Sequence, residues 1–405
     1  MYRFAIIGVT GFGKVHFDDM RTLTEEGKGK PVAATVVNPE EAPEQMAWLL
    51  EQGCEIFSDF KEMFRRFQAK IDLCFIPTGI AWHATMTKAA LEAGAHVFVE
   101  KPAAALLKDV RSMHTASRAS LKFVAVGYQA VYQPDVLALK ERFAEGKLGT
   151  IRRLKCRGLW SRTADYYGRN SWAGRLQAND QWVLDSPFNN ALAHYLNLML
   201  FLGGTQVQSS VVPYTVQAEL YRANAIESAD TACIRVEAAG NQEILFYVTH
   251  ACAANLGPEM VIETSAATIT WAQGKPWTIS WHSDKPDETL EPAESPRSHV
   301  RDALMARMTD NSAFICDLEI AGTQTLVANA AHDSSEIHDF PAEIVEQRPT
   351  DLGLLTVANG IDEAIATAFQ QGKLFSELGL GWAVAGQPID VRDYMGLKAA
   401  QPALV

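Results

Sequence analysis

The sequence reads Arg-Phe-Ala-Ile-Ile-Gly-Val-Thr-Gly-Phe-Gly at residues 3–13. Its apolar start predicts a buried strand over Arg3–Gly8, and the glycines that follow predict a turn over Gly8–Gly13. Lys14–Thr24 is then predicted to be helical. A glycine turn between a first strand and a helix lets backbone N–H groups approach a pyrophosphate, with the positive end of the helix behind them. The alternative is a glycine-rich hairpin, which the strand before and the helix after the turn disfavour.

The turn departs from the usual dinucleotide fingerprint, G-x-G-x-x-G, at one position. Gly8 and Gly13 match its first and third glycines, whereas Thr10 stands at the second. The additional Gly11 can supply the close backbone approach instead. The residues expected to contact a cofactor here are Gly8, Thr10, Gly11, Phe12 and Gly13.

A second strand is predicted over Val32–Val37 and ends in Asn38. An acidic residue normally stands near this position to bind the ribose hydroxyls. An asparagine can still bind them, without the charge that repels a 2′-phosphate. Glu40 and Glu41 follow, and the next lysine or arginine is Lys61. Because no local cation would hold the phosphate of NADP, we favour NAD as the cofactor, with Asn38 among its contacts.

Strands and helices continue to alternate after this point. A buried strand is predicted over Ile71–Ile76, followed by a loop with Pro77 and Thr78 and by a helix with His83. This rhythm predicts a parallel, doubly wound sheet of the Rossmann type. The loop lies at the same sheet edge as the glycine turn, so it should contact the nicotinamide side of the cofactor. His83 is either a site residue or a helix-face histidine satisfied locally.

The apolar run His96–Val99 predicts a further buried strand, and Pro102 prevents a helix from extending back through Lys101. Glu100 and Lys101 therefore stand at the carboxyl end of a strand, which is where ligands bind in open α/β sheets. The alternative is a solvated turn with an ordinary ion pair.

Three motifs together resemble one enzyme family. They are Gly8-x-x-Gly11-x-Gly13-x-x-His16, Pro77-Thr78-x-x-x-x-His83, and Glu-Ala-Gly-Ala-His-Val-Phe-Val-Glu-Lys-Pro at residues 92–102. They look like the glucose-fructose oxidoreductase/inositol dehydrogenase family, Gfo/Idh/MocA. The resemblance is close in the first domain and covers the second in order and length. It implies an NAD(P)-dependent oxidoreductase acting on a secondary hydroxyl or keto group of a sugar, polyol or sugar acid, and a homo-oligomer, either a dimer or a tetramer.

The first domain is placed at residues 1–125, and a second domain is expected over residues 126–405. The alternation of strands and helices ends after the first domain. Strand-like runs then follow one another without crossover helices, which predicts an α+β domain with a large, open, mostly antiparallel sheet. These runs are Ile151–Leu159, Gln206–Leu220, Thr231–Glu237, Ile244–Ala251, Met260–Glu263, Thr268–Trp271 and Trp277–Trp281. Residues 284–298 are expected to form an exposed loop. Leu352–Gln371 is expected to be an amphipathic helix, and by analogy with the family the tail after it packs back near the domain junction.

The connection after the first of these strands is rich in aromatic and basic side chains. Among them, Tyr166, Arg169, Trp172 and Arg175 suit stacking on sugar faces and binding of hydroxyl or carboxylate oxygens. A loop packed against a domain edge would also bury aromatic side chains. We assign these four as candidate substrate-binding residues.

A helix is expected to begin at Asp185-Ser186-Pro187, which supplies a cap and a first-turn proline. On this helix Asn190, His194 and Asn197 follow the spacing i, i+4, i+7 and form one polar stripe. Such a stripe must be paired in a core or face a cavity. Asp185 is assigned only to the helix start.

The family resemblance gives this stripe a role. It implies that His194 matches the histidine of the family's Asp-x-x-x-His motif, which works beside the lysine of Glu-Lys-Pro. Asn190 stands where that motif has its aspartate. We therefore assign Lys101, His194 and Asn190 to catalysis, and Asn190 and His194 also to substrate binding.

The composition excludes several classes of function. The 405 residues are 48% hydrophobic and 21% charged, with a formal net charge of −12 and no basic run interleaved with aromatics, so a nucleic-acid partner is not expected. No run approaches the roughly 20 apolar residues of a membrane helix, and the N-terminal apolar run is too short for a signal peptide. The six cysteines show no C-x-x-C pair and fit a reducing cytoplasm, and no metal-ligand cluster is visible.

Two alternatives to a dehydrogenase stay open. NAD could assist glycoside cleavage by oxidising a ring carbon transiently, so that elimination breaks the bond. Alternatively, a chain with asparagine at the motif's aspartate position could be a non-catalytic dinucleotide-binding sensor.

Overall fold

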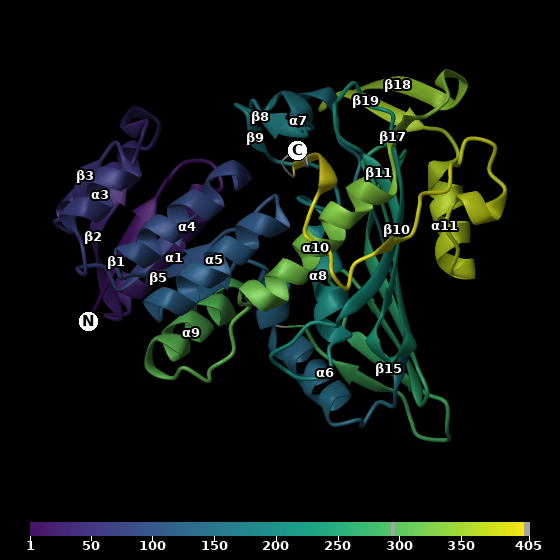
Figure 1. Cartoon of the computed structure of the whole chain (residues 1–405), viewed down its shortest axis with the longest axis horizontal. Coiled ribbons are helices and arrows are strands. Elements are labelled where there is room, and N and C mark those ends of the chain that lie inside the picture. The colour runs from purple at the N-terminus through teal and green to yellow at the C-terminus, as the bar shows by residue number, and fades with distance from the viewer. Residues whose placement is uncertain (293–295, 401–405) are drawn as a thin grey trace. The chain divides into compact units, whose positions relative to one another are not determined.

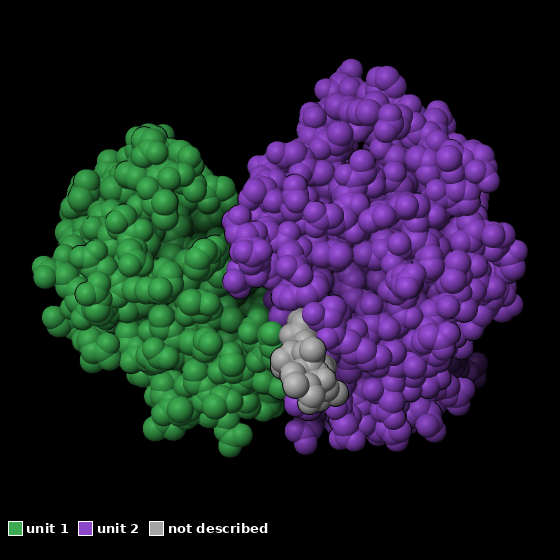
Figure 2. Space-filling view, turned by 45° about the horizontal axis from the view of Figure 1, so that its top comes forward, with its two compact units in different colours: residues 1–104, 108–132, 295–322 green, residues 105–107, 133–294, 323–405 purple. Residues whose placement is uncertain are grey.

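The computed structural model describes residues 1–292 and 296–400. The chain forms two compact units, which Figure 2 shows in different colours. Unit 1 comprises residues 1–104, 108–132 and 295–322, and unit 2 comprises residues 105–107, 133–294 and 323–405.

The centre of unit 1 is a parallel sheet of six described strands in the order β3-β2-β1-β4-β5-β6. Its strands are β1 (Tyr2–Ile7), β2 (Gly29–Thr35), β3 (Glu55–Phe57), β4 (Leu73–Ile76), β5 (His96–Val99) and β6 (Val124–Val126). The strand order reverses at β1, which pairs with β2 on one side and with β4 on the other. Such a reversal creates a crevice at the carboxyl ends of the strands. The predicted parallel, doubly wound sheet is confirmed.

The helices that accompany this sheet are α1 (Gly13–Glu25), α2 (Pro43–Glu51), α3 (Phe60–Arg66), α4 (His83–Glu92), α5 (Leu107–Ser120) and α9 (Pro296–Thr309). Figure 1 shows α1, α3, α4 and α5 beside the strands. The strands bury nearly continuous apolar runs, as expected for a sheet covered on both faces. Phe4, Phe75 and Phe98, from the adjacent strands β1, β4 and β5, have no exposed surface. The ring of Phe75 meets the other two edge-on, at 5.8 and 6.0 Å between centroids, so aromatic packing holds the middle of the sheet together.

Helix α9 is joined to α1 by ion pairs between one buried carboxylate and two partly exposed arginines. The carboxylate of Asp19 in α1 is buried and pairs with both Arg297 and Arg301 of α9, the latter at 3.0 Å. The loop predicted over residues 284–298 is therefore only partly correct. It contains a short strand, β16 (Glu288–Leu290), and the first residues of α9, while residues 293–295 lie outside the described residues.

Unit 2 is built on a large mixed sheet with the order β16-β15-β14-β13-β7-β12-β11-β10-β17, in which β20 also pairs with β10. The other strands of this sheet are β7 (Ile151–Leu159), β10 (Pro213–Arg222), β11 (Thr231–Ala238), β12 (Gln242–Thr249), β13 (Leu256–Thr264), β14 (Ala267–Ala272), β15 (Trp277–Trp281), β17 (Ile337–Asp339) and β20 (Ile389–Asp390). Among the described pairs only β7–β12 and β10–β17 are parallel. The prediction of a large, mostly antiparallel sheet is confirmed.

Helices lie on both faces of this sheet (Figure 1), with α8 (Ala193–Leu202) on one face and α11 (Ile361–Gln371) on the other, and both contact β7 and β12. Ile365 of α11 joins Tyr221 and Tyr247 of the sheet in a buried apolar core. Further helices and small strands are α6 (Pro134–Ala144), α7 (Ala164–Gly168), β8 (Gln177–Ala178), β9 (Gln181–Trp182) and α10 (Leu318–Ser334), whose first residues, 318–322, belong to unit 1. In the described part of the chain, no helix combines the length and apolarity needed to cross a bilayer.

The segment Leu352–Gln371, predicted as one helix, divides into a strand and a helix. β18 (Val345–Thr350) and β19 (Gly353–Ala358) form an antiparallel hairpin, and α11 begins only at Ile361. The helix prediction was wrong over the first half because pairing with β18 overrides the local amphipathic pattern.

The predicted strand Gln206–Leu220 begins too early. β10 starts at Pro213, and the N–H of Val211 donates to the carbonyl of Leu200 at 2.8 Å. The preceding residues therefore pack against the end of α8 instead of joining the sheet.

Candidate functional site

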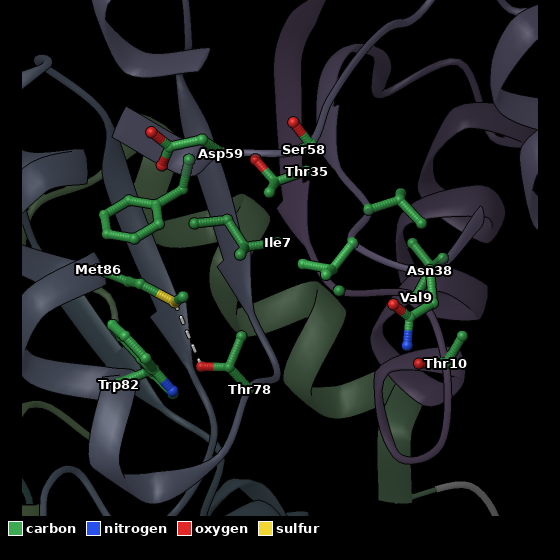
Figure 3. A pocket seen from close by; sticks show the side chains of 14 residues that line it. Ile7, Val9, Thr10, Thr35, Asn38, Ser58, Asp59, Thr78, Trp82 and Met86 are labelled. Carbon is green, nitrogen blue, oxygen red and sulfur yellow. Dashed lines mark hydrogen bonds between the residues drawn. The ribbon is translucent and has the colours of Figure 1, made fainter. Parts of the chain in front are cut away.

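A pocket of about 490 Å³ lies in unit 1 at the carboxyl ends of β1, β2 and β4 (Figure 3). It is lined by Ile7, Gly8, Val9, Thr10, Thr35, Val36, Val37, Asn38, Ser58, Asp59, Phe60, Thr78, Trp82 and Met86. This edge, at the strand where the order reverses, is where open α/β sheets bind ligands. Of the residues proposed from sequence, the pocket brings together Gly8, Thr10, Asn38 and Thr78.

The glycine turn has the tight geometry that the sequence predicts. Gly8 has φ +89°, and the N–H of Gly13 donates to the carbonyl of Thr10 at 2.8 Å. A Cβ atom on Gly13 would stand 2.9 Å from the carbonyl oxygen of Gly8, which a side chain cannot do without displacing the backbone. Gly11 and Phe12 are exposed in the middle of the turn. The close approach of strand, turn and helix α1 fits a pyrophosphate site.

Asn38 lies three residues beyond the end of β2, because this strand ends at Thr35 and not at Val37 as predicted. Its Nδ2 donates to Oε1 of Glu41 at 2.9 Å. Since the N–H side of the amide is turned to Glu41, the amide oxygen remains as an acceptor. The pair thus presents an acceptor and a nearby negative charge, a combination that suits ribose hydroxyls and disfavours a 2′-phosphate.

Sequence reasoning missed the pocket residues that follow β3, which are Ser58, Asp59 and Phe60. Asp59 also accepts a hydrogen bond from the N–H of Lys61 at 2.9 Å and so caps α3. The sequence signal for the strand before these residues was weak, because β3 has only three residues, too few to show a strand pattern.

Trp82 and Met86 contribute an apolar wall that was also missed. Figure 3 shows them, with Thr78, on the opposite side of the pocket from Thr10 and Asn38. The hydroxyl of Thr78 donates to the sulfur of Met86 at 3.5 Å. The Trp82 side chain is 52% exposed beside the pocket, a placement that suits stacking on a planar ring.

His83 is fully buried, and both ring nitrogens face backbone carbonyls. Nδ1 lies 2.8 Å from the oxygen of Pro102, and Nε2 lies 2.9 Å from the oxygen of Thr78. Burial lowers the pKa of the ring, which favours the neutral form, so one nitrogen donates and the other does not. His83 therefore connects the loop of Pro77 and Thr78 to the Glu-Lys-Pro segment.

Glu100 is also buried, and its carboxylate contacts the backbone of Lys101 at the end of β5. Its Oε1 accepts from Nε2 of His16 at 2.8 Å, and its Oε2 accepts from the backbone N–H of Lys101 at 3.0 Å. Burial alone would raise the pKa of this carboxyl. The hydrogen bond from His16 and the nearby charges of Lys101 and Arg297 instead bring its pKa to about 2. The charged carboxylate fixes the backbone at Lys101, which is half-buried directly after β5.

In unit 2, three of the four residues expected to bind substrate form one stack. The guanidinium carbon of Arg169 lies 3.6 Å from the ring centroid of Tyr166 and 5.2 Å from that of Trp172. The backbone N–H of Arg175 donates to the carbonyl of Trp172 at 3.2 Å, but its side chain forms an exposed ion pair with Glu227 at 3.0 Å. The structure therefore groups Tyr166, Arg169 and Trp172 but not Arg175.

The helix expected from Asp185 onward begins later. Residues 186–192 form successive turns, and α8 starts at Ala193. Asn190 thus precedes the helix that carries His194 and Asn197, and the predicted single stripe is wrong. The reason is local: Nδ2 of Asn189 donates to the carbonyls of Val183 and Leu184, at 3.4 and 3.2 Å, which stabilises turns over a regular helix.

Asp185 does not cap a helix, contrary to the prediction. Its carboxylate is 4% exposed and accepts from Nδ2 of Asn190 and from the N–H of Gly174, each at 2.7 Å. Nη2 of Arg169 lies 3.9 Å away. One buried carboxylate therefore contacts both the turns before α8 and the connection that carries the stacked residues.

The other end of α8 is fixed by a buried lysine. Lys140 of α6 has no exposed surface, and its Nζ donates to the carbonyls of Phe201, Gly204 and Ser209, at 2.5, 2.6 and 3.0 Å. A cation at a helix C-terminus satisfies carbonyls that have no partner within the helix. Lys140 thus anchors α8 to α6.

Comparison with known families gives a match over unit 1. Residues 2–128 match the family model GFO_IDH_MocA, described as "Oxidoreductase family, NAD-binding Rossmann fold". The matched region contains the parallel sheet, the glycine turn and the Glu-Lys-Pro segment.

Similar proteins include dehydrogenases of polyols and sugars. The chain is 27% identical over 198 residues to inositol 2-dehydrogenase of Azotobacter vinelandii, which is 48% of this chain and 53% of that protein, so it spans about half the length of this relative. A solved inositol dehydrogenase homolog from A. vinelandii, complexed with NAD⁺, has a TM-score of 0.69 at 16% identity, over 82% of this chain and 95% of the other. A levoglucosan dehydrogenase in complex with NADH and L-sorbose has a TM-score of 0.68 at 17% identity, over 82% and 96%. These structures share the fold.

Proposed function

Because residues 2–128 belong to the Gfo/Idh/MocA oxidoreductase family, we propose that the chain is an NAD-dependent dehydrogenase acting on a CH–OH group of a sugar, polyol or sugar acid. The observation that carries this proposal is the unit 1 pocket, with its glycine turn and its position at the carboxyl ends of the strands. The relatives named inositol 2-dehydrogenase and levoglucosan dehydrogenase support the substrate class.

The pocket residues fit NAD in three respects. Among the described residues, nothing beyond the neighbouring positions lies within 4 Å of a Cβ atom built on Gly11, so the turn between Gly8 and Gly13 has open space at the N-terminus of α1 for a pyrophosphate. The amide oxygen of Asn38 can accept from a ribose hydroxyl, and the neighbouring Glu41 disfavours the extra phosphate of NADP. Trp82 and Met86 offer an apolar wall to a planar ring. When bound, NAD supplies the acceptor for the hydride.

Lys101 and His194 are assigned to the chemistry at the substrate hydroxyl group. In oxidation of the alcohol, the carbon loses hydrogen with its electron pair, and the oxygen loses its proton to a base as the carbonyl forms. His194 is assigned as that base. The ammonium of Lys101 is assigned to the substrate oxygen, where it stabilises developing negative charge.

Tyr166, Arg169 and Trp172 are assigned to substrate binding. Their stacked side chains present aromatic faces and a guanidinium, which suit sugar C–H faces and oxygens respectively. We also expect a homo-oligomer, a dimer or a tetramer, which light scattering of the purified chain would test.

The decisive experiment is a screen for NADH formation over sugars, polyols and aldonic acids. We expect at least one of these to give net NADH together with a stoichiometric oxidised product. Release of a reducing sugar from glycosides without net NADH would indicate NAD-assisted cleavage instead. Retained NAD binding without turnover on the whole panel would indicate a sensor.

A further inference from the structure

Arg162 differs from the other half-buried arginines of unit 2. Among the described residues of this unit, it is the one member of that group without a carboxylate within 4 Å. Its Nε is buried without a hydrogen-bond partner in the described part of the chain, and its Nη1 donates to the carbonyl of Ser161 at 3.3 Å. The other half-buried arginines each pair with a carboxylate: Arg142, Arg153, Arg157, Arg222, Arg235 and Arg348.

Two aromatic rings contact the guanidinium of Arg162. Its central carbon lies 4.8 Å from the ring centroid of Tyr166 and 5.6 Å from that of Trp160. The guanidinium of Arg169 lies 3.6 Å from the Tyr166 centroid, so one ring contacts two cations. Aromatic faces attract a cation but carry no net charge that would neutralise it. Because charged groups that are removed from water are normally paired, an anionic ligand would stabilise the charge of Arg162.

His250 reports the positive charge of this region. Burial and then the charge of Arg162 lower the pKa of its ring to about 3, and Arg169 acts in the same direction. Nδ1 of His250 donates to the carbonyl of Trp160 at 2.7 Å. The ring is therefore neutral near pH 7, and the two arginines supply the cationic charge.

The neighbouring carboxylates are engaged elsewhere. Asp185 accepts from a backbone N–H and from a side-chain amide, each at 2.7 Å, and lies 3.9 Å from Nη2 of Arg169. Asp230 accepts from two backbone N–H groups, at 2.9 and 2.8 Å. Of the two positive charges beside Tyr166, Asp185 thus offsets the one on Arg169. The charge on Arg162 remains for a ligand.

Arg162 lies among the residues assigned to the reaction, all within unit 2. It shares the Tyr166 ring with Arg169, which belongs to the stack assigned to substrate binding. Its other aromatic neighbour, Trp160, meets the ring of Tyr195 edge-on at 6.1 Å between centroids. Tyr195 directly follows His194 in the first turn of α8. An anion held by Arg162 would therefore lie beside the residues assigned to the substrate.

We propose that Arg162 binds a carboxylate of the substrate, so that the chain acts on sugar acids in preference to neutral sugars and polyols. This inference rests on the proposed function, because it names the substrate class of the same site. The planar guanidinium can donate two parallel N–H groups to a carboxylate. A monoanion matches the single charge left on Arg162, whereas a phosphate dianion would exceed it and would meet the carboxylate of Asp185.

The first test measures binding without turnover. Calorimetric titration of the NADH-loaded chain compares two matched pairs, glucuronate with glucose and gluconate with sorbitol, in which a carboxylate replaces a CH₂OH group. We expect each acid to bind at least about tenfold more tightly than its neutral counterpart, the range for a hydrogen bond to a charged group. Glucose 6-phosphate is the third probe, and tighter binding of it than of glucuronate would refute the assignment of a carboxylate.

Arg162→Gln should remove the preference for acids. The dissociation constant of each acid should rise roughly tenfold or more, while those of glucose and sorbitol stay within about three-fold. Arg162→Lys keeps the charge without the planar fork and should retain only part of the preference. Arg152→Gln is the matched control, because Arg152 is an exposed arginine of β7, the strand that leads to this region. Equal weakening of the acids in Arg152→Gln and Arg162→Gln would show that only net charge matters, which would overturn the inference.

Turnover measurements separate this inference from the proposed function. If the acids bind through Arg162 but none of them yields NADH, the inference is supported and the proposed dehydrogenase activity fails. If neutral sugars or polyols are oxidised as efficiently as the acids and Arg162→Gln changes neither rate, the inference fails and the proposed function stands. Should Arg162→Gln not fold, the wild type and Arg162→Lys decide. Equal binding of acid and neutral counterpart in the wild type, or unchanged acid binding in Arg162→Lys, would refute the inference.

Discussion

The side-chain amide of Asn38 donates a hydrogen bond of 2.9 Å to the carboxylate of Glu41, beyond the end of β2. Of these two residues only Glu41 carries a negative charge, and Asp59 adds a carboxylate to the pocket lining itself. We expect NAD to bind at least about tenfold more tightly than NADP, because a 2′-phosphate would approach the carboxylates of Glu41 and Asp59. Fluorescence titration with both cofactors measures the ratio, and tighter binding of NADP would contradict the expectation.

Glu41→Gln should identify the source of that discrimination. Glutamine can still accept the hydrogen bond from Asn38 but carries no charge, so the preference for NAD should shrink by roughly three-fold or more while NAD affinity changes less. Glu40→Gln removes the same charge from the preceding exposed residue. An equal effect in the two variants would show that the total negative charge of residues 40 and 41 sets the cofactor preference, and not Glu41 in particular.

Lys101→Met should abolish turnover and leave NAD affinity within about three-fold. The ammonium is assigned to the substrate oxygen, and loss of such a group costs on the order of 100-fold or more in rate. Lys70→Met, at an exposed position of the same unit, is the control. If Lys101→Met unfolds in thermal melts, the lysine has a structural role instead.

Glu100→Gln should lower stability in a pH-dependent manner. The carboxyl has a pKa of about 2 in the folded chain against an ordinary value of 4.5, so its ionised form stabilises the fold above pH 4.5, and this contribution is lost as the pH falls toward 2. The shift corresponds to a contribution on the order of 3 kcal/mol. Urea unfolding of wild type and variant at pH 7 and pH 3 should give a large difference at the higher pH and a smaller one at the lower. Equal differences in the free energy of unfolding at the two pH values would show that the negative charge of Glu100 does not strengthen its hydrogen bonds with His16 and Lys101.

Asp19→Asn should destabilise unit 1 by separating α9 from α1. The substitution leaves Arg297 and Arg301 without their buried carboxylate, and because both arginines keep some exposure to water we expect a loss of roughly 2 kcal/mol, less than for a fully buried pair. Asp18→Asn is the neighbouring control, because Asp18 pairs with Lys14 on the surface and should matter by less than about 1 kcal/mol. Chemical denaturation compares the two variants, and similar losses would exclude a special role for the α9 contact.

Unit 1 could be predicted closely because its signals are local. The strands β1, β4 and β5 contain short apolar runs, and the turn from Gly8 to Gly13 and the strand His96–Val99 stand where the pattern places them, whereas the three-residue strand β3 was not predicted. Helix α9 was not predicted, since its attachment to Asp19 depends on a contact between residues 282 positions apart. The strand β19 was missed for the same kind of reason: only its partner β18 distinguishes it from a helix.

The residues of the candidate site likewise divide into those that the sequence predicted and those that it did not. Gly8, Thr10 and Asn38 were found because they follow strands in sequence. Trp82 was missed because an isolated tryptophan in a helical pattern indicates a core as readily as a pocket. The hydrogen bond between Asp185 and Asn190 depends on the irregular turns of residues 186–192, which no periodicity indicates.

Lys140 offers a way to observe motion at the C-terminal end of α8, the helix that carries His194 in its first turn. Amine-selective reagents react with an uncharged amine that solvent can reach, whereas the amine of Lys140 has no exposed surface and donates to three carbonyls at the end of α8. It can be labelled only when α6 and α8 separate. Mass spectrometry can measure the rate of acylation at Lys140 relative to that at the exposed Lys70. This ratio would therefore report how often α8, the helix that carries His194, separates from α6.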